Sequence, residues 1–247
     1  MSIDKFVLYW IIFGIILFPV QFFISAPYGR HTNKSFGLLI PNKIGWFFME
    51  SWALLTFIIV YAKYFNTNMY SLFFGAVYAL HYVNRGIIYP LRTKTDGKKI
   101  PLSVSLSAML FNSVNAALNA YFLGVICKYA DNYFLKWNFI VGLVLFVLGI
   151  YINNKSDNML IALRKPGETG YKIPNGFLFK YISCPNLFGE MVEWLGYALM
   201  TFNLASLSFF IWTVANLLPR AYHHHKWYLE HFKDYPKERK AVFPFVF

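Results

Sequence analysis

Long apolar runs alternate with short polar connections along most of this 247-residue chain. A membrane helix needs about 20 mainly apolar residues, because every backbone N–H and C=O must be satisfied within the segment. Seven runs have this pattern, and they predict an all-α integral membrane protein with seven transmembrane helices. The predicted spans cover residues 6–24, 46–65, 70–91, 102–127, 139–153, 186–200 and 202–218.

The connections between these runs predict how the chain is organised. Neither a Gly/Ser-rich linker nor an internal repeat interrupts the sequence, so we expect a single polytopic domain over residues 1–247. Residues 154–185 form a long connection whose Pro and Gly residues predict a shaped loop. Residues 220–247 form an amphipathic tail. The first run lacks a basic leader and a small-residue cleavage site, so we expect a retained anchor.

Composition supports a membrane protein. The chain is 57% hydrophobic, 21% aromatic and only 14% charged, which is too apolar for an ordinary soluble protein. Its net charge of +12 does not indicate a nucleic acid partner, because the Lys and Arg residues are spread between apolar runs rather than gathered in one basic block. Two cysteines are too few for a disulfide framework.

The Lys and Arg residues divide unequally between the two sides of the predicted membrane. Of 23 such residues, Arg85 lies within a span, four (Lys5, Lys63, Lys128 and Lys136) lie on one side, and the rest lie on the other. The positive-inside rule therefore predicts a cytoplasmic C-terminus and an N-terminus that is outside or lumenal, in a bacterial inner membrane or the endoplasmic reticulum. If the sixth and seventh runs were one helix, the tail would lie on the opposite side.

Polar residues recur at helical spacing inside the predicted spans. Ionisable groups at membrane depth usually face a bundle interior or a cavity. Glu50 lies about one turn inside the second span, and Tyr78, Tyr82, Arg85 and Tyr89 share a face of the third. A carboxylate and a phenol at this depth can polarise a carbonyl and stabilise an enolate. The fourth span carries a similar stripe, Asn112, Asn115 and Asn119. Hydrogen bonds that hold neighbouring helices together explain this stripe as well as a functional role does.

The long connection and the tail carry a second group of polar residues. Arg164, Lys165 and Arg220 could clamp phosphates, since guanidinium groups bind them bidentately, although attraction to anionic lipid also accounts for such charges. The sequence has no G-x-G-x-x-G motif and no P-loop, so a nucleotide would be held in an unusual way. The consecutive histidines 223–225 diverge on a helix and lack partners at metal spacing, so we predict no metal site.

Several of these segments together resemble the steroid 5α-reductase family. The resemblance is dense over residues 150–247 and weaker upstream, and its motifs are Asn153-Asn-Lys-Ser-Asp157, Leu163-Arg-Lys-Pro-Gly-Glu-Thr-Gly-Tyr171, Asn186-Leu-Phe-Gly-Glu190, Arg220-Ala-Tyr-His-His-His-Lys-Trp-Tyr228, Trp46-Phe-Phe-Met-Glu50 and His81-Tyr-Val-Asn-Arg85. It implies a seven-span membrane enzyme that uses NADPH to reduce the Δ4 double bond of a 3-oxosteroid. Animal members usually carry Gln before the Glu, so Met49-Glu50-Ser51 is closer to the plant and bacterial type.

The resemblance also implies roles for individual residues. Tyr82, supported by Glu50, is expected to hydrogen-bond the 3-oxo group while a hydride reaches carbon 5. The residues 92–99 depart from the family pattern and receive no role. Steroid and membrane lipid are the implied partners of a monomer, without nucleic acid or metal. The cofactor-binding residues implied by the resemblance are Arg30, Arg85, Tyr89, Asn153, Asp157, Arg164, Tyr171, Asn186, Glu190, Arg220, His224 and Tyr228.

Other functions share parts of this pattern. A related enoyl-reductase could act on polyprenols or enoyl-CoA, and activity with Δ4-steroids would distinguish the two. A membrane methyltransferase would depend on S-adenosylmethionine instead. In a transporter, polar stripes would line a path open to both sides, whereas the concentration of charge on one side favours a soluble cofactor.

Overall fold

A computed structural model describes residues 2–165, 167–168 and 170–247 of the chain. The described residues form two compact units. The first unit contains residues 2–26, 137–165 and 170–247, and the second contains residues 27–136 and 167–168. Both units are mainly helical, as the apolar runs predict.

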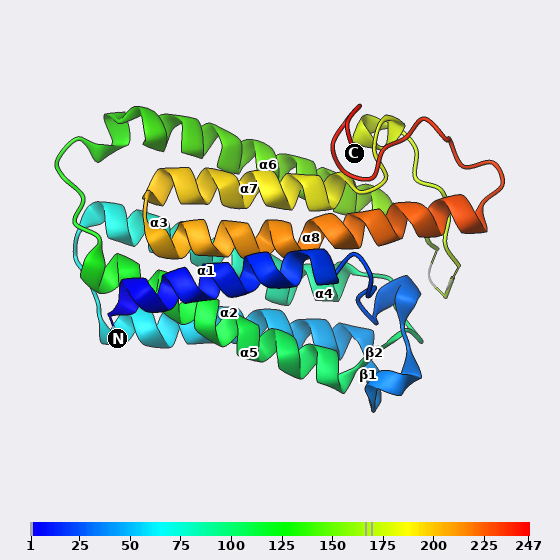
Figure 1. Ribbon diagram of the computed structural model, residues 1–247, viewed down its shortest axis with the longest axis horizontal. Coiled ribbons are helices and arrows are strands. Elements are labelled where there is room, and N and C mark those ends of the chain that lie inside the picture. Colours follow the sequence, from blue (N-terminus) through cyan, green and yellow to red (C-terminus); the bar gives the residue numbers. More distant parts are fainter. Residues whose placement is uncertain (1, 166, 169) are drawn as a thin grey trace. The chain divides into compact units, whose positions relative to one another are not determined.

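The first unit is a row of helices in the order α6, α7, α8 and α1 (Figure 1). Their bounds are Ile3–Val20 for α1, Trp137–Ala162 for α6, Pro185–Thr201 for α7 and Leu204–His231 for α8. After α7, Phe202 has a left-handed backbone with a φ of 45°, and the Asn203 side chain caps α8 by accepting a hydrogen bond from the Ser206 N–H at 3.0 Å. The sixth and seventh predicted runs are therefore separate helices.

Glycines allow α6 and α7 to approach closely. Gly142 and Gly149 lie seven residues apart on α6, and Gly189 and Gly196 lie seven residues apart on α7. A Cβ atom added at Gly189 would lie only 2.5 Å from the backbone nitrogen of Asn153. Small residues at such contacts are typical of helix packing in membranes, where backbones gain van der Waals contact by close approach.

The second unit is built around α2 (Asn42–Lys63), which packs against both α5 (Leu102–Tyr121) and the run formed by α3 (Met69–Val83), η3 (Asn84–Ile88) and α4 (Tyr89–Arg92). The η3 segment and η4 (Phe122–Ile126), which continues α5, are π-helical turns. Strand β1 (Leu39–Pro41) pairs antiparallel with β2 (Lys99–Pro101). This small sheet is an exception to the all-α prediction.

Short 3-10 helices occupy several of the connections. In the second unit these are η1 (Gly29–His31), η2 (Lys34–Phe36) and η5 (Tyr133–Leu135). In the first unit, η6 (Phe177–Lys180) lies in the connection between α6 and α7. These turns give the connections a defined backbone path.

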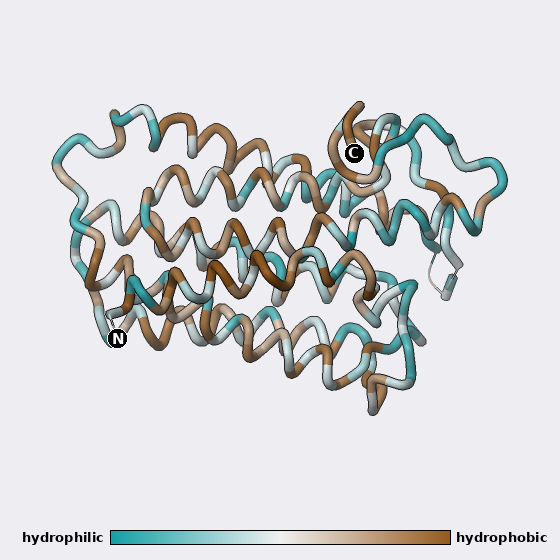
Figure 2. Tube along the Cα trace, viewed as in Figure 1, coloured by the Kyte–Doolittle hydropathy of each residue, from teal (hydrophilic) through white to brown (hydrophobic). Residues whose placement is uncertain are grey.

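Five helices of the described chain are long and apolar enough to cross a membrane: α1, α2, α5 with η4, α6 and α8. Only 17% of the apolar window of α1 is buried, and Figure 2 shows this helix as hydrophobic along most of its length. Such a surface is stable in lipid and not in water. The chain is therefore a multi-pass membrane protein. The third and sixth predicted runs are helical but lie outside this set, since α7 has 17 residues and α3 has 15 before its π turn.

Two predicted boundaries are wrong because polar residues extend the helices. The fifth run was expected to end at Asn153, but α6 continues to Ala162, so the connection after it is shorter than 154–185. Asn154 and Ser156 donate side-chain hydrogen bonds to carbonyls one turn earlier, which makes them compatible with a helix. The seventh run was expected to end at Leu218, but α8 continues to His231.

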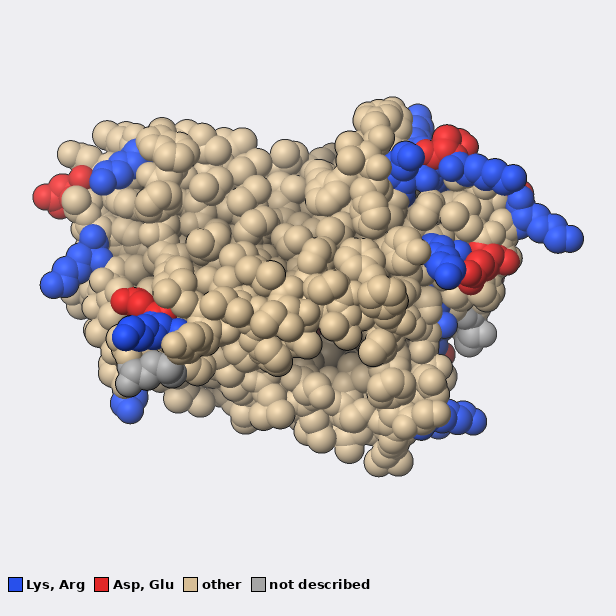
Figure 3. All heavy atoms as spheres, viewed as in Figure 1, with Lys and Arg blue, Asp and Glu red and all other residues tan. Residues whose placement is uncertain are grey.

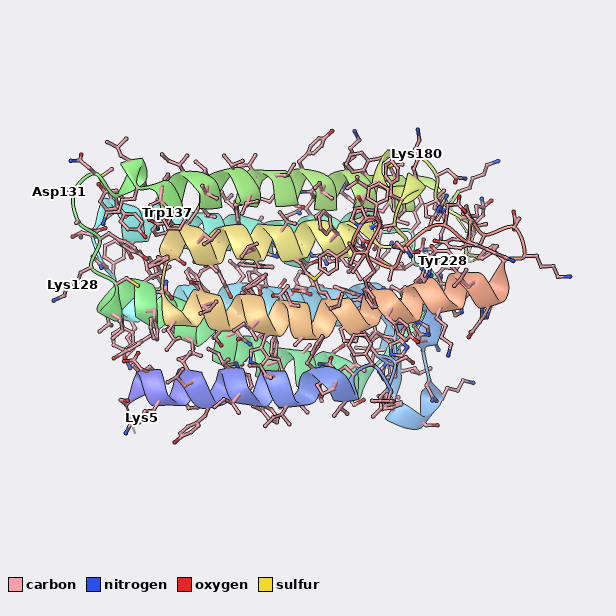
Figure 4. All side chains as sticks on the ribbon, turned by 45° about the horizontal axis from the view of Figure 1, so that its top comes forward. Lys5, Lys128, Asp131, Trp137, Lys180 and Tyr228 are labelled. Carbon is pink, nitrogen blue, oxygen red and sulfur yellow. The ribbon has the colours of Figure 1, made fainter. Side chains whose placement is uncertain are left out.

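Charged residues gather at the ends of the helices. On the face drawn in Figure 3, Lys, Arg, Asp and Glu lie at the ends, and the long middle stretch shows none of them. Within the first unit, Lys5 and Trp137 lie at one end, whereas Lys180 and Tyr228 lie at the other (Figure 4). The apolar middle has the arrangement expected of helices that cross a bilayer.

Candidate active site

The side chains expected to polarise a carbonyl lie in the second unit, on α2 and α3. Tyr82 is buried and Glu50 is half-buried. The two helices touch next to these residues, because a Cβ at Gly86 would lie 2.8 Å from the backbone nitrogen of Ser51. The Ser51 hydroxyl also donates to the Gly86 carbonyl at 3.3 Å. Glu50 therefore lies beside the helical run that carries Tyr82.

Tyr78 lies one turn before Tyr82 on α3. It has no solvent exposure, and it is in electrostatic contact with both Tyr82 and Glu50. Its ring centroid lies 4.9 Å from that of Tyr82 and 4.3 Å from that of Phe57 on α2. The buried ring of His81 meets the Tyr82 ring edge-on at 5.1 Å. The Tyr82 ring is thus fixed between two buried neighbours.

Arg85 is a buried cation enclosed by aromatic rings. Its guanidinium lies 4.7 Å from the ring centroid of Tyr89 and 5.7 Å from that of Trp46. Arg85 belongs to the π turn η3, a structure that sequence periodicity did not predict and that often occurs at functional sites. Cation–π contact stabilises a desolvated guanidinium. Trp46 was visible in a motif, but its role as a partner of Arg85 was missed.

Arg30 lies near this group on η1. The Tyr28 ring, two residues earlier, packs against Trp46 at a centroid distance of 6.2 Å. The Thr32 hydroxyl contacts the Lys99 carbonyl of β2 at 3.3 Å and so fixes the segment to the sheet. Arg30 therefore belongs to a segment that packs beside Trp46, the ring partner of Arg85.

Three of the expected cofactor-binding residues form a hydrogen-bonded cluster where α6 meets α7 in the first unit. The Asn153 side chain donates to the Asn186 carbonyl at 3.0 Å, and the Asn186 side chain donates to Asp157 Oδ1 at 3.0 Å. Asn153 and Asp157 are buried. Glu190 is half-buried and lies one turn beyond Asn186 on α7. The close contact at Gly189 holds the two helices at this point.

Three further expected residues share one face of α8. Arg220, His224 and Tyr228 lie four residues apart, and this spacing places side chains one above another. Tyr228 is buried, and its ring stacks on that of Tyr235 at a centroid distance of 5.0 Å. The residues that follow α8 therefore cover the end of this face.

The remaining pair, Arg164 and Tyr171, lies in the connection between α6 and α7. The Arg164 Nε atom donates to the Gly170 carbonyl at 3.1 Å, and its guanidinium lies 5.0 Å from the Tyr171 ring centroid. The Tyr171 ring meets Trp227 of α8 edge-on at 5.0 Å. The basic loop is therefore attached to α8. Positions 166 and 169 of its motif lie outside the described residues.

A hydrogen-bond network that the sequence did not reveal connects Ser183 and the residues that follow α8 with α8 itself. The Ser183 hydroxyl is hydrogen-bonded to His225 Nδ1 at 2.6 Å and to the Tyr235 hydroxyl at 2.7 Å. Burial raises the pKa of Tyr235 above its ordinary value, so this phenol stays protonated at neutral pH. Arg239 donates to Asn175 Oδ1 at 2.6 Å, which secures the loop. These partners lie far apart in sequence, so spacing gave no signal.

The consecutive histidines point to different partners. The His223 ring contacts the Gln21 carbonyl at 3.0 Å, whereas His225 contacts Ser183. Within the described ranges, no group of three or more His, Cys, Asp and Glu side chains is arranged to hold a metal ion.

Comparison with known proteins identifies close relatives of the chain. A family model described as 3-oxo-5-alpha-steroid 4-dehydrogenase matches residues 98–247. The chain is 44% identical to steroid 5-alpha-reductase DET2 of Solanum lycopersicum, with 100% of the chain and 99% of that protein covered. It is 42% identical to steroid 5-alpha-reductase DET2 of Arabidopsis thaliana, over 91% of the chain and 89% of that protein. It is 38% identical to 3-oxo-5-alpha-steroid 4-dehydrogenase 1 of Homo sapiens, over 90% of the chain and 87% of that protein.

Proposed function

The chain belongs to the 3-oxo-5-alpha-steroid 4-dehydrogenase family, and we infer from this membership that it reduces the Δ4 double bond of a 3-oxosteroid with NADPH. The observation that carries the inference is the length of the similarity, since relatives from plants and mammals match about nine tenths of the chain or more. The plant relatives are named steroid 5-alpha-reductases, and the mammalian relatives are named 3-oxo-5-alpha-steroid 4-dehydrogenases, which are two names for the same reaction. The chain is therefore an oxidoreductase of steroid metabolism.

The carbonyl clamp of the second unit suits this reaction. A bound nicotinamide cofactor supplies the hydride that reduces carbon 5 of the enone. As the double-bond electrons shift, negative charge develops on the 3-oxo oxygen. We assign Tyr82 to donate a hydrogen bond to this oxygen and Glu50 to orient the phenol, so that the enolate is stabilised where its charge appears. Protonation at carbon 4 then gives the saturated ketone.

The donor groups of the first unit fit a phosphorylated dinucleotide. Arg164 and Arg220 offer planar cations for pyrophosphate or the 2′-phosphate, which distinguishes NADPH from NADH. The cluster of Asn153, Asp157 and Asn186 offers amide donors and a carboxylate acceptor for ribose or carboxamide groups. We therefore assign these residues, together with Tyr171, Glu190, His224 and Tyr228, to cofactor binding. We also assign Arg30, Arg85 and Tyr89 of the second unit to cofactor contacts, as the resemblance implies.

We also propose that α3 and α7 cross the membrane, which gives seven spans. In the second unit, β1 pairs with β2, so the start of α2 lies beside the start of α5 and the α3 run has to return over the full distance. In the first unit, the Asn138 side chain donates to the Leu199 carbonyl at 3.1 Å, while Asn153 reaches Asn186. Hence α7 spans the same distance as the apolar part of α6.

In the proposed seven-span arrangement, the connection between α6 and α7 and the C-terminus lie on the same side of the membrane. Lys180 of the basic connection and Tyr228 of α8 lie at the same end of the first unit (Figure 4), and the Tyr171 ring of that connection packs on Trp227 of α8. The excess of Lys and Arg at that end assigns it to the cytoplasm. A soluble cofactor reaches the protein from there. Because one chain supplies both the clamp and the cofactor residues, we expect a monomer.

The test of this function is product analysis with the purified protein. In detergent or lipid nanodiscs, NADPH oxidation should depend on a Δ4-3-oxosteroid such as progesterone or testosterone. Mass spectrometry should show a 5α product that has gained two hydrogen atoms. Binding of NADPH without turnover of such steroids would instead favour a polyprenol or enoyl-CoA substrate. Failure to bind NADPH would refute a reductase.

A further inference from the structure

A column of aromatic rings crosses the contact between α2 and α3 in the second unit. The Tyr61 and Phe57 rings of α2 stack at a centroid distance of 5.5 Å, and Phe57 stacks on Tyr78 of α3 at 4.3 Å. Tyr78 in turn lies 4.9 Å from Tyr82. Residues 57 and 61, like residues 78 and 82, are four apart, so each helix contributes two rings from one face.

The hydroxyl groups of this column have different surroundings. At one end, the Tyr61 hydroxyl pairs with the Ser71 hydroxyl at 3.0 Å. At the other end lies Tyr82, the proposed donor to the 3-oxo group. Tyr78 lies between them without solvent exposure and interacts with both Tyr82 and Glu50. A phenylalanine at position 78 would stack on Phe57 equally well, so ring packing alone does not require the Tyr78 hydroxyl.

We propose that Tyr78 is a positioning residue of the carbonyl clamp, whose hydroxyl orients the Tyr82 phenol and the Glu50 carboxylate toward the 3-oxo group. This inference rests on the proposed function. The residues that flank Glu50 on α2 are less suited to the task. The Met49 side chain cannot donate a hydrogen bond, and the Ser51 hydroxyl is directed to the Gly86 carbonyl. Tyr78 supplies a phenol from the opposite helix.

Orientation of the clamp affects the transition state more than the bound substrate, because charge on the 3-oxo oxygen develops only as the hydride is transferred. Loss of the Tyr78 hydroxyl should therefore lower kcat and leave the binding of steroid and cofactor nearly unchanged. A residue that only fills space would behave differently, since its loss would lower stability and change the KM for steroid.

The first test is Tyr78→Phe, which keeps the ring stack. We expect kcat to fall roughly tenfold, in line with the loss of one buried hydrogen bond, with the steroid KM, the NADPH dissociation constant and the melting temperature close to wild type. The matched control is Tyr61→Phe, which removes a hydroxyl from the same column at the end away from the clamp. It should leave kcat unchanged.

A double-mutant cycle decides whether Tyr78 acts through Tyr82. In a Tyr82→Phe background, Tyr78→Phe should cause little further loss, because the group that it orients is already gone. Independent, multiplicative losses would overturn the inference, as would wild-type kcat in Tyr78→Phe or a fall in stability that accounts for the lost activity. In those cases the reductase function would stand. A wild-type enzyme that turns over no Δ4-3-oxosteroid would refute the proposed function and this inference together.

Discussion

We assign Tyr82 and Glu50 to act on the substrate through placement, because both lie in a packed helix contact rather than on a loop. Tyr82 is 3% exposed and is fixed between Tyr78 and His81. A donor that is held in advance stabilises developing charge without reorganising during the reaction. The activity should therefore be sensitive to each of the two polar groups.

We expect Tyr82→Phe and Glu50→Gln each to lower kcat by about 10²- to 10³-fold, the range found for removal of an oxyanion donor. Neither residue is assigned to the cofactor, so the NADPH dissociation constant should change by less than about twofold. Steady-state kinetics and fluorescence titration measure the two quantities. Wild-type kcat in both variants would remove the carbonyl-clamp assignment.

The connection between α6 and α7, which we assign to cofactor binding, gives the opposite prediction, in which NADPH affinity is lost. Arg164→Ala removes a planar cation that stacks on Tyr171, so NADPH affinity should fall about 10- to 100-fold while steroid affinity stays near wild type. Arg164→Lys keeps the charge but not the fork, and it should have an intermediate effect. Titration calorimetry with NADPH and with steroid tests this.

A matched control for the loop is Lys155→Ala. Lys155 is a cation on the last turns of α6, the helix that precedes Arg164, but it packs over the rings of Tyr151 and Phe177. Its loss should change NADPH affinity little. Equal weakening in Arg164→Ala and Lys155→Ala would mean that net charge, rather than a phosphate contact, holds the cofactor. Equal loss of steroid and NADPH binding would indicate misfolding.

Sequence spacing grouped the polar residues of the third span on one face, whereas only the resemblance pointed to the proposed cofactor residues of α8. Arg220, His224 and Tyr228 follow a spacing of four, and the structure places them on one face of α8. The link between Ser183 and His225 joins residues 42 apart, and no local pattern reports it. Tyr78 was visible in the polar stripe of the third span, but only the ring geometry indicates a role for it.

At the scale of whole elements, hydropathy predicted each long helix but not where it ends. An apolar run stops at the first polar residues, whereas a membrane helix continues wherever the protein satisfies those groups. Asp157 illustrates this point, because it is buried in α6 and accepts a hydrogen bond from Asn186. The π turn at η3, where Gly86 packs closely against Ser51 of α2, was not predicted from hydropathy either.

The contact between α6 and α7 should be the most sensitive element to small substitutions. In Gly189→Ala, the new Cβ would lie 2.5 Å from the Asn153 backbone nitrogen, so the helices have to separate. We expect a loss of about 1–3 kcal/mol in stability and weaker NADPH binding, because the cluster of Asn153, Asp157 and Asn186 spans this contact. Thermal unfolding in detergent and NADPH titration measure both effects.

Gly170→Ala serves as the control for stability. A Cβ at that position meets nothing within 4 Å, so its melting temperature should match wild type. If Gly189→Ala also melted like wild type and bound NADPH normally, the close approach of α6 and α7 would not support the cofactor cluster.

At the scale of the whole molecule, the number of spans decides the topology. If only the five most apolar helices crossed the membrane, residues 127–136 and the tail would lie on the same side. With seven spans they lie on opposite sides, because α7 adds a third crossing between them. Hydropathy alone does not separate these arrangements, since α3 and α7 carry polar residues that face the protein interior.

Labelling of single cysteines distinguishes the two topologies. After Cys127→Ala and Cys184→Ala, a cysteine is introduced by Asp131→Cys or by Lys237→Cys. Because seven spans place residue 131 outside and residue 237 in the cytoplasm, a membrane-impermeant maleimide should label the first in intact bacterial cells that express the protein in the inner membrane, and the second only after permeabilisation. Labelling of both from the same side would establish that α7 does not cross the membrane.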